Sequence, residues 1–310
     1  MNQIIQSYLD AHIKEYEIES YDQSTAFEHF INKCIINRLS TERFDPIDVM
    51  TDDGEIGLDG VAILLNGQLV TDLASCHVIY ENNRSVDVKI VFIQTKTSAS
   101  FDGGEISTFL KGVKHFFETN DVRPKTNPKM ENLISIKDYI YAQSINQPQK
   151  PSLEMYYVCC GRWSDENNLS NNIATDVRFF ESTRDFSTVN FYPFDIDKMI
   201  ITYTEMRRKI RKTFLMEKRL PFYQMPGIKV AYFGLIKCKD IVRLLTDDQG
   251  ALFKNIFEDN VRDFQGYNSV NSEIKATLLD KESQDRFAVL NNGITIIASK
   301  IETEGDEITI

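Results

Sequence analysis

The sequence predicts an α/β protein in which helices flank a mixed sheet, followed by part of a second domain of the α+β class. Apolar residues recur at helical spacing over residues 24–39 and 106–117, Asn66-Gly67 separates two short apolar segments, and Val88 to Ile93 is a continuous apolar run. These patterns give the order helix, hairpin, buried strand, helix.

Each early element has its own physical basis. Residues 24–39 carry a stripe of apolar side chains that one face of a helix can bury. Residues 61–65 and 69–72 should pair as a hairpin, because Asn-Gly readily adopts the positive φ angles of a two-residue turn. Residues 86–95 alternate and then become apolar, which predicts a strand that enters the core.

The later elements follow from the same patterns and from proline positions. Residues 121–152 should form a loop with a short helix at 136–142, and Pro221 and Pro226 indicate a boundary. We therefore expect domains at 1–222 and 223–310, the second being the beginning of a longer domain. The other expected elements are a helix at 197–214 and strands at 153–160, 189–194, 228–236, 293–300 and 307–310.

Composition excludes several classes of protein. The chain has 310 residues, 42% of them hydrophobic, and no apolar run of the roughly 18 to 20 residues that a membrane span requires. We expect a cytoplasmic protein with no membrane association. Its 5 cysteines lack zinc-ligand spacing and are read as reduced thiols. A net charge of -11 argues against non-specific coating of nucleic acid, although a local basic groove remains compatible with it.

Four residues form the candidate catalytic site: Glu28, Asp59, Gln94 and Lys96. If 61–65 and 88–93 are neighbouring strands, Asp59 and Gln94 meet at adjacent strand ends, where their oxygens can bind one Mg²⁺ or Mn²⁺ ion. Lys96 points to the same face as Gln94 and can hold the attacking water. Glu28, on the first predicted helix, can bind the metal through water or orient the nucleophile.

Structural explanations of the same residues stay open. Lys96 can be a solvated strand end, Asp59 a turn residue between glycines, and Glu28 an ordinary helix position.

A basic segment is the candidate surface for nucleic acid. Arg207, Arg208, Lys209, Arg211 and Lys212 form the densest positive run of the chain. On a helix they would lie opposite the apolar side chains and could contact phosphates, whereas the alternative is a solvated helix.

The order of Glu28, Asp59 and Gln94-Thr95-Lys96 resembles the PD-(D/E)xK restriction-endonuclease-like superfamily in its Gln-x-Lys variant. Glutamine removes one negative charge from the cation site of the commoner form, which should weaken metal affinity. The resemblance implies a restriction-endonuclease-like sheet, Mg²⁺ dependence and the four site residues above.

A second resemblance spans most of the chain. Residues 260–266, 270–274 and 290–296, together with Phe92 to Ser98, resemble the abortive infection phage resistance (AIPR) family. It implies a nuclease of bacterial anti-phage defence, with DNA favoured over RNA as substrate. A homodimer is compatible with cutting both strands, and a phage or host protein could be the trigger.

Two other functions remain open. The nuclease fold could serve as a non-catalytic sensor or scaffold that binds a protein or nucleic acid, which the acidic charge favours. Alternatively, the chain could be a regulatory subunit whose activity requires a further carboxy-terminal region.

Overall fold

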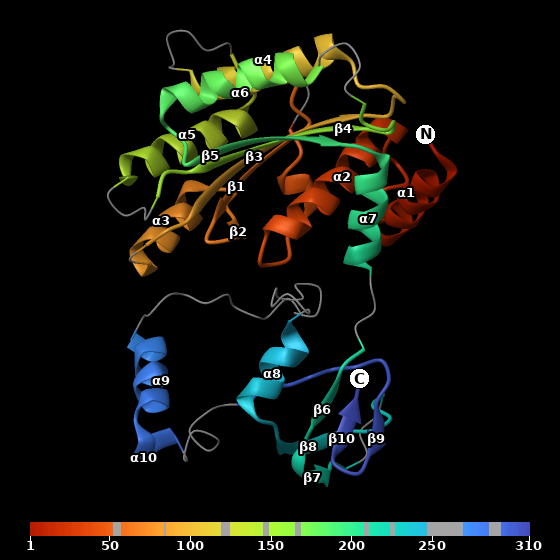
Figure 1. The fold of residues 1–310 in the computed structure, drawn as a ribbon, viewed down its shortest axis with the longest axis vertical. Coiled ribbons are helices and arrows are strands. Elements are labelled where there is room, and N and C mark those ends of the chain that lie inside the picture. Colours follow the sequence, from red (N-terminus) through yellow and green to blue (C-terminus); the bar gives the residue numbers. More distant parts are fainter. Residues whose placement is uncertain are drawn as a thin grey trace. The chain divides into compact units, whose positions relative to one another are not determined.

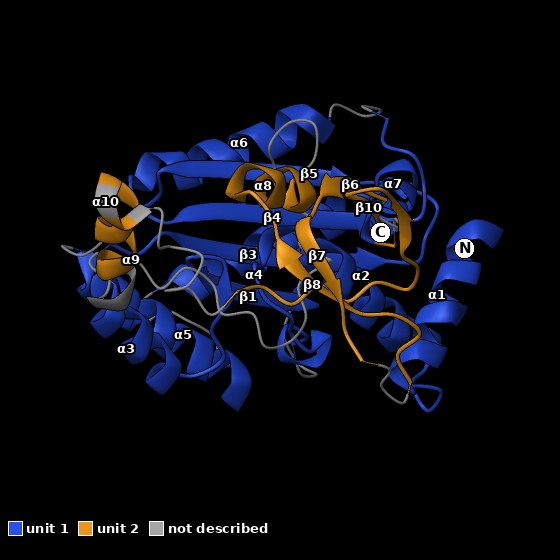
Figure 2. Ribbon diagram, turned by 90° about the horizontal axis from the view of Figure 1, so that it is seen from below, with its two compact units in different colours: residues 1–206, 259–266 blue, residues 207–258, 267–310 orange. Residues whose placement is uncertain are grey.

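The computed structural model describes residues 1–51, 57–83, 85–118, 125–144, 149–164, 169–207, 211–223, 227–246, 269–284 and 293–310. Within these residues the chain divides into two compact units, one up to Met206 and the other from Arg207 onward (Figure 2). The division falls at residue 206, and the domains at 1–222 and 223–310 stay a prediction.

The first unit is built on a five-stranded mixed sheet in the order β2-β1-β3-β4-β5 (Figure 1). Strand β3 pairs antiparallel with β1, which pairs antiparallel with β2, whereas β3, β4 and β5 run parallel. The predicted mixed α/β fold is therefore confirmed. The strands are β1 (Gly60–Leu65), β2 (Gln68–Leu69), β3 (Val88–Lys96), β4 (Ser152–Cys159) and β5 (Thr188–Phe194).

Helices cover both faces of this sheet (Figure 1). One hydrophobic cluster joins the sheet to α3 (Leu73–Asn82), α4 (Gly103–Phe117), α5 (Pro128–Ala142) and α6 (Leu169–Thr183). A second cluster joins the other face to α1 (Gln3–Tyr16), α2 (Gln23–Leu39) and α7 (Ile196–Met206). The sheet is thus the central layer of three.

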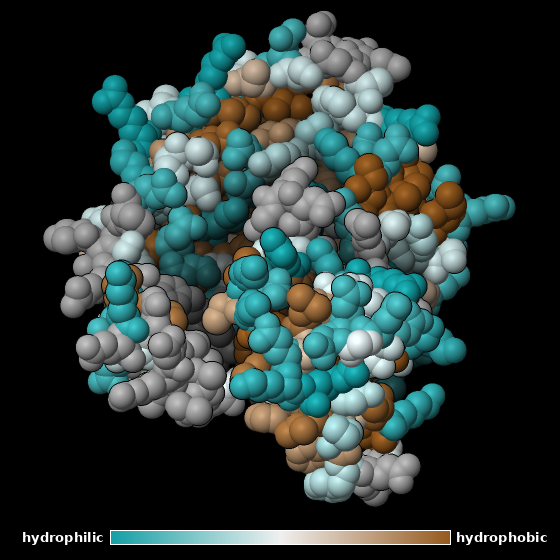
Figure 3. All heavy atoms as spheres, turned by 60° about the horizontal axis from the view of Figure 1, so that its bottom comes forward, coloured by the Kyte–Doolittle hydropathy of each residue, from teal (hydrophilic) through white to brown (hydrophobic). Residues whose placement is uncertain are grey.

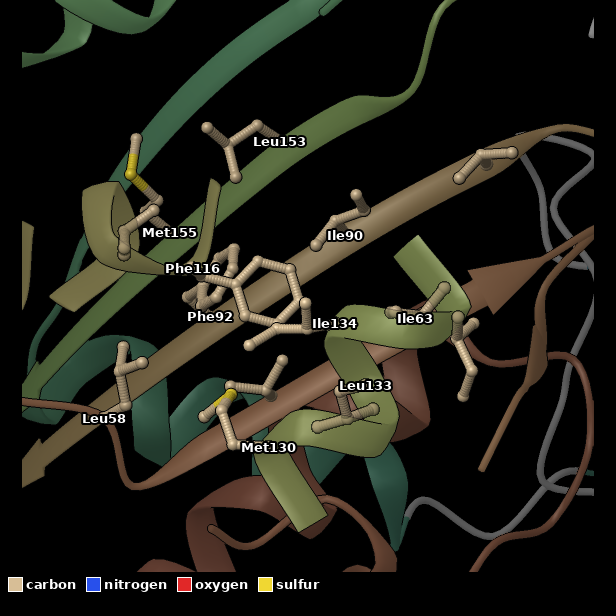
Figure 4. Close-up of a cluster of buried hydrophobic side chains, with 14 of the residues drawn as sticks. Leu58, Ile63, Ile90, Phe92, Phe116, Met130, Leu133, Ile134, Leu153 and Met155 are labelled. Atoms are coloured by element: carbon tan, nitrogen blue, oxygen red, sulfur yellow. The ribbon is translucent and has the colours of Figure 1, made fainter. Parts of the chain in front are cut away.

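Strand β3 shows why the sequence has a continuous apolar run. Ile90 and Phe92 point into the cluster beneath α4 and α5, and Val91 and Ile93 point into the cluster beneath α2. A strand buried on both faces needs apolar residues at every position. Figure 4 shows Phe92 and Ile90 beside Phe116 and the α5 side chains.

The hairpin between β1 and β2 forms at the predicted dipeptide. Asn66 and Gly67 have φ angles of 53° and 84°, as a two-residue turn with positive φ at both central positions requires. The Asn66 side chain also accepts a hydrogen bond of 2.8 Å from the Asp87 backbone N–H. The turn is therefore tied to the residues just before β3.

Several elements differ from the sequence-based expectations. Helices α1 and α3 were not predicted, and α5 is longer than the short helix expected at 136–142. Only Ile5, Leu9 and His12 of α1 are buried, so its apolar stripe is narrow. Residues 293–300, expected as a strand, pair with no strand in the described part of the chain.

The helix expected at 197–214 is also wrong at its end. It stops at Met206, and Thr213–Leu215 forms strand β6, which pairs with β10 (Glu307–Thr309). A partner strand almost a hundred residues along the chain overrides the local helical pattern.

The second unit contains two small antiparallel sheets. One has the order β6-β10-β9, with β9 at Glu302–Glu304, and the other pairs β7 (Glu217–Pro221) with β8 (Tyr232–Leu235). Its buried cluster centres on Phe214, Leu244 and Ile308. Its helices are α8 (Cys238–Leu245), α9 (Ser269–Leu279) and α10 (Lys281–Gln284).

Exposed apolar side chains are scattered over the described residues. The face drawn in Figure 3 carries brown patches between larger teal areas. Exposed hydrophobic residues of the second unit include Leu220, Phe233 and Leu235 on β7 and β8. Among the described residues, none of the helices combines the length and hydrophobicity that crossing a bilayer requires.

Replacing Phe92 by alanine should destabilise the first unit strongly. Phe92 is fully buried, and its ring packs edge-on against Phe116 with the ring centres 5.1 Å apart. We expect the free energy of unfolding to fall by about 3 to 5 kcal/mol, measured by chemical denaturation. Phe179→Ala, at an exposed position on α6, is the matched control and should cost about 1 kcal/mol or less. Equal losses in the two variants would contradict this description of the core.

Candidate active site

The register between β1 and β3 brings Asp59 to Gln94. Gly60 pairs with Ile93 in an antiparallel ladder, so Asp59, one residue earlier, lies opposite Gln94, one residue later. The Asp59 N–H donates to the Ile93 carbonyl at 2.9 Å and extends the ladder by one step. The start of one strand and the end of the next therefore meet at one edge of the sheet.

The Asp59 carboxylate is held by direct hydrogen bonds from the end of β3. Its Oδ2 accepts bonds from Gln94 Nε2 at 2.7 Å, from the Thr95 N–H at 2.7 Å and from Thr95 Oγ1 at 2.8 Å. Within the described residues every hydrogen bond to this carboxylate falls on Oδ2. Oδ1 thus keeps its acceptor capacity for another ligand.

Burial makes the Asp59 carboxylate costly to ionise. Desolvation raises the pKa of Asp59 above its ordinary value of 3.8, although the Thr95 hydrogen bonds, the charge of Lys96 and the Gln94 hydrogen bond oppose this rise. A nearby cation would favour the ionised form. The electrostatics of the position therefore suit a positively charged ligand.

Two buried amide side chains that donate to Asp59 leave their oxygens without a hydrogen-bond partner among the described residues. They are Gln94 Oε1 and Asn32 Oδ1, and both side chains are at least nine-tenths buried. Each amide donates a hydrogen bond to Asp59 through its NH₂ group: Gln94 Nε2 to the carboxylate and Asn32 Nδ2 to the backbone carbonyl, the latter at 3.3 Å. An unpaired buried acceptor costs roughly 1 to 3 kcal/mol, which a bound water or cation can offset.

These donors fit a hard divalent cation. Carboxylate and amide oxygens are the protein ligands that Mg²⁺ accepts. The described residues contain no group of three His, Cys, Asp or Glu side chains placed to bind a metal, so Asp59 would need amide oxygens or water to complete the coordination. Gln94 would turn its amide to present Oε1, a rotation about a soft terminal torsion.

Lys96 lies beyond Gln94 on the same side of β3 and meets an acidic partner. Its Nζ is 3.4 Å from Glu105 Oε1, and the two side chains are 36% and 44% exposed. Glu105 lies in the first turn of α4, and its Oε2 accepts a hydrogen bond of 3.0 Å from the Tyr157 hydroxyl. Lys96 is also close enough to lower the pKa of Asp59.

Glu28 lies on α2, the helix that also supplies Asn32. It is half-buried on α2, one helical turn before Asn32, whose side chain reaches Asp59. Helix α2 packs on the face of the sheet that Val91 and Ile93 occupy, whereas Gln94 and Lys96 continue the alternation of the α4 face. The catalytic role of Glu28 stays a prediction.

Four residues at the site had no role in the sequence-based hypothesis: Asn32, Thr95, Glu105 and Tyr157. Only Glu105 could have been noticed in the sequence, because Asp102 and Glu105 have the spacing of a capping box at the start of α4. Asp102 does cap the helix by accepting the Glu105 N–H at 2.9 Å. The Glu105 side chain, however, extends to Lys96 and Tyr157.

The basic segment does not lie on one helix. Arg207 follows the end of α7, while Arg211 and Lys212 directly precede β6. Arg211 pairs with Glu302 at 2.8 Å, and Lys212 Nζ donates to the Thr246 carbonyl at 2.9 Å. Arg208 and Lys209 lie outside the described residues. Nucleic-acid binding by these five residues stays a prediction.

Comparison with known proteins bears on the other end of the chain. Residues 257–310 match the family model described as AIPR protein. This match supports AIPR family membership and covers only the last part of the chain, not the candidate site. No curated protein and no solved structure matches the chain. The predicted motif at 260–266, and Leu290 to Asn292 of the motif at 290–296, lie outside the described residues.

Replacing Asp59 by asparagine should stabilise the protein at pH 8. Folding raises the pKa of Asp59, so its contribution to stability is fully present below the ordinary value of 3.8 and is lost as pH rises through the folded pKa. Asparagine keeps an acceptor for Thr95 and removes the buried charge. We expect a higher free energy of unfolding for Asp59→Asn at pH 8 and a shrinking difference as pH falls.

The control for this experiment is Asp10→Asn, an exposed position on α1. Its effect on the free energy of unfolding at pH 8 should be small. A variant at Asp59 that is less stable than the natural protein at pH 8 would contradict the burial argument.

Proposed function

We propose that the chain is a divalent-metal-dependent phosphodiesterase that cleaves nucleic acid, with DNA favoured over RNA, in bacterial defence against phage. The observation that carries this proposal is the convergence of Asp59 and Gln94 at the paired ends of β1 and β3, where the buried Gln94 Oε1 has no hydrogen-bond partner among the described residues. The AIPR match supports the abortive-infection role.

Each residue has a distinct task in this proposal. Asp59 and Gln94 would hold Mg²⁺ or Mn²⁺, which supplies Lewis-acid stabilisation of the phosphate and lowers the pKa of a bound water. Lys96 would orient the attacking water and stabilise negative charge that develops on the phosphate oxygens. Glu28 would orient the nucleophile from α2, and Asn32 would hold the backbone of Asp59.

A restriction-endonuclease-like fold is part of the proposal. The described order of α2, the β1 and β2 hairpin, β3 and α4 agrees with the arrangement that the PD-(D/E)xK resemblance implies. The sheet order β2-β1-β3-β4 places the Asp59 and Gln94 strands side by side. This agreement supports the superfamily assignment.

A non-catalytic sensor or scaffold is the second candidate function. The net charge of -11 and the pairing of Arg211 with Glu302 favour it, because both reduce the positive surface available to phosphates. In that case the site would bind a cation or a protein partner without hydrolysis.

The first test measures cleavage directly. The purified chain is incubated with supercoiled plasmid and with single-stranded RNA in Mg²⁺ or Mn²⁺, and with a chelator as the metal-free condition. We expect metal-dependent cleavage of the plasmid and a loss of roughly 100-fold or more in the Lys96→Ala and Asp59→Ala variants.

Lys89→Ala is the matched control, because Lys89 lies near the start of the same strand. It should cleave at the natural rate. Undiminished cleavage in both site variants would show that the active site lies elsewhere, and a folded, metal-loaded protein without cleavage would favour the sensor.

The second test measures metal binding without activity. A ligand that binds only the folded protein stabilises it, by about 2.7 kcal/mol at a concentration 100 times its Kd. We expect Mg²⁺ or Mn²⁺ to raise the free energy of unfolding of the natural protein and not of Asp59→Asn. Equal metal-induced stabilisation of the two proteins would exclude Asp59 as a ligand.

A further inference from the structure

The ammonium group of Lys96 has a dedicated acidic partner on the helix that follows its strand. Glu105 Oε1 is 3.4 Å from Lys96 Nζ, and both residues lie on the face of the sheet that α4 covers. Gln94, the neighbour of Lys96 on this face, is neutral. Glu105 therefore supplies a negative charge that β3 itself lacks.

Tyr157 orients the other carboxylate oxygen of Glu105. Its hydroxyl donates to Glu105 Oε2 at 3.0 Å, and the residue is fully buried on β4, in register with Gln94. Burial, followed by the Glu105 hydrogen bond, raises the pKa of Tyr157, so the hydroxyl keeps its proton. Both oxygens of Glu105 are thus assigned, one to Tyr157 and one to Lys96.

The segment that leads from β3 to α4 is also held in place. Ser98, in the segment between β3 and α4, accepts the Cys160 N–H at 3.0 Å and the Cys159 thiol at 3.1 Å. Gly161 lies so close to this segment that an added Cβ would stand 2.0 Å from the Ala99 carbonyl oxygen. Residues 98 and 99, which precede α4, are therefore held against the end of β4.

Stability alone does not explain this arrangement. Half-exposed ion pairs contribute about 0 to 1 kcal/mol, so Lys96 and Glu105 add little to the free energy of unfolding. A buried tyrosine hydroxyl that fixes one partner, however, reduces the conformational freedom of the other. The geometry restricts where the lysine can place its charge.

We propose that Glu105, oriented by Tyr157, is a positioning residue that holds the Lys96 ammonium group beside Asp59. The inference rests on the proposed function, in which Lys96 acts on the water and the phosphate. Glu105 touches neither of them and acts only through Lys96. Without the Glu105 carboxylate, the Lys96 side chain would be free to move its ammonium group away from Asp59.

The first measurement does not depend on catalysis. Acylation of individual lysines by an activated ester is followed by mass spectrometry in the natural protein, Glu105→Gln and Tyr157→Phe. We expect the labelling rate of Lys96 to rise roughly two- to five-fold in both variants, while Lys89 and Lys111 stay unchanged. An unchanged rate at Lys96 overturns the inference.

Two control variants separate positioning from general disturbance. Tyr156→Phe alters the neighbouring residue on β4, which faces the opposite cluster, and Glu118→Gln alters the C-cap of α4. Neither should change the labelling of Lys96. Thermal unfolding of all variants confirms that each is folded before labelling.

The second measurement distinguishes this inference from the proposed function. In the plasmid assay we expect Glu105→Gln, and to a smaller extent Tyr157→Phe, to lower kcat while KM and metal affinity stay unchanged. If Lys96→Ala abolishes cleavage and Glu105→Gln has no effect, the positioning role is wrong and the nuclease stands. If no protein cleaves but Lys96 labelling rises in both variants, the ion-pair positioning stands and the nuclease is wrong.

Discussion

The antiparallel register between β1 and β3 is the constraint on which the candidate site depends. Asp59 is not in a regular strand, and it meets Gln94 only because Gly60 pairs with Ile93. A slip of one residue would turn Gln94 and Lys96 to the opposite face of the sheet. Such a slip is costly, since β1 and β3 bury different side chains on each face. The core therefore fixes the site.

Local charge at this edge differs from the overall charge of the chain. The net charge is -11, yet among the described residues the groups that interact with Asp59 are two neutral amides, a threonine and one lysine. Even a small number of charges interact strongly in a desolvated place, because solvent screens them poorly. The site would thus respond strongly to one bound cation.

The sequence predicted those parts of the fold that depend on neighbouring residues. Asn66-Gly67 defined the hairpin, and the apolar pattern of β3 defined a strand buried on both sides. Helix α1 was not predicted because it buries few residues, so its apolar pattern is weak. Strand β6 was not predicted because its partner strand β10 lies far along the chain.

The same distinction applies to the site. Asp59, Gln94 and Lys96 could be selected from the residues at two strand ends, and the structure brings Asp59 into contact with Gln94. Asn32, Glu105 and Tyr157 come from α2, α4 and β4, and only the packing of those elements brings them there. Sequence spacing carries no information on such contacts between layers.

The close approach of Gly161 to Ala99 has a consequence for how this architecture can vary. Any side chain at residue 161 would collide with the main chain at Ala99, in the segment that leads from β3 to α4 and Glu105. The approach of the chain after β4 to the segment between β3 and α4 is thus set by backbone contact, not by a side chain that can be exchanged.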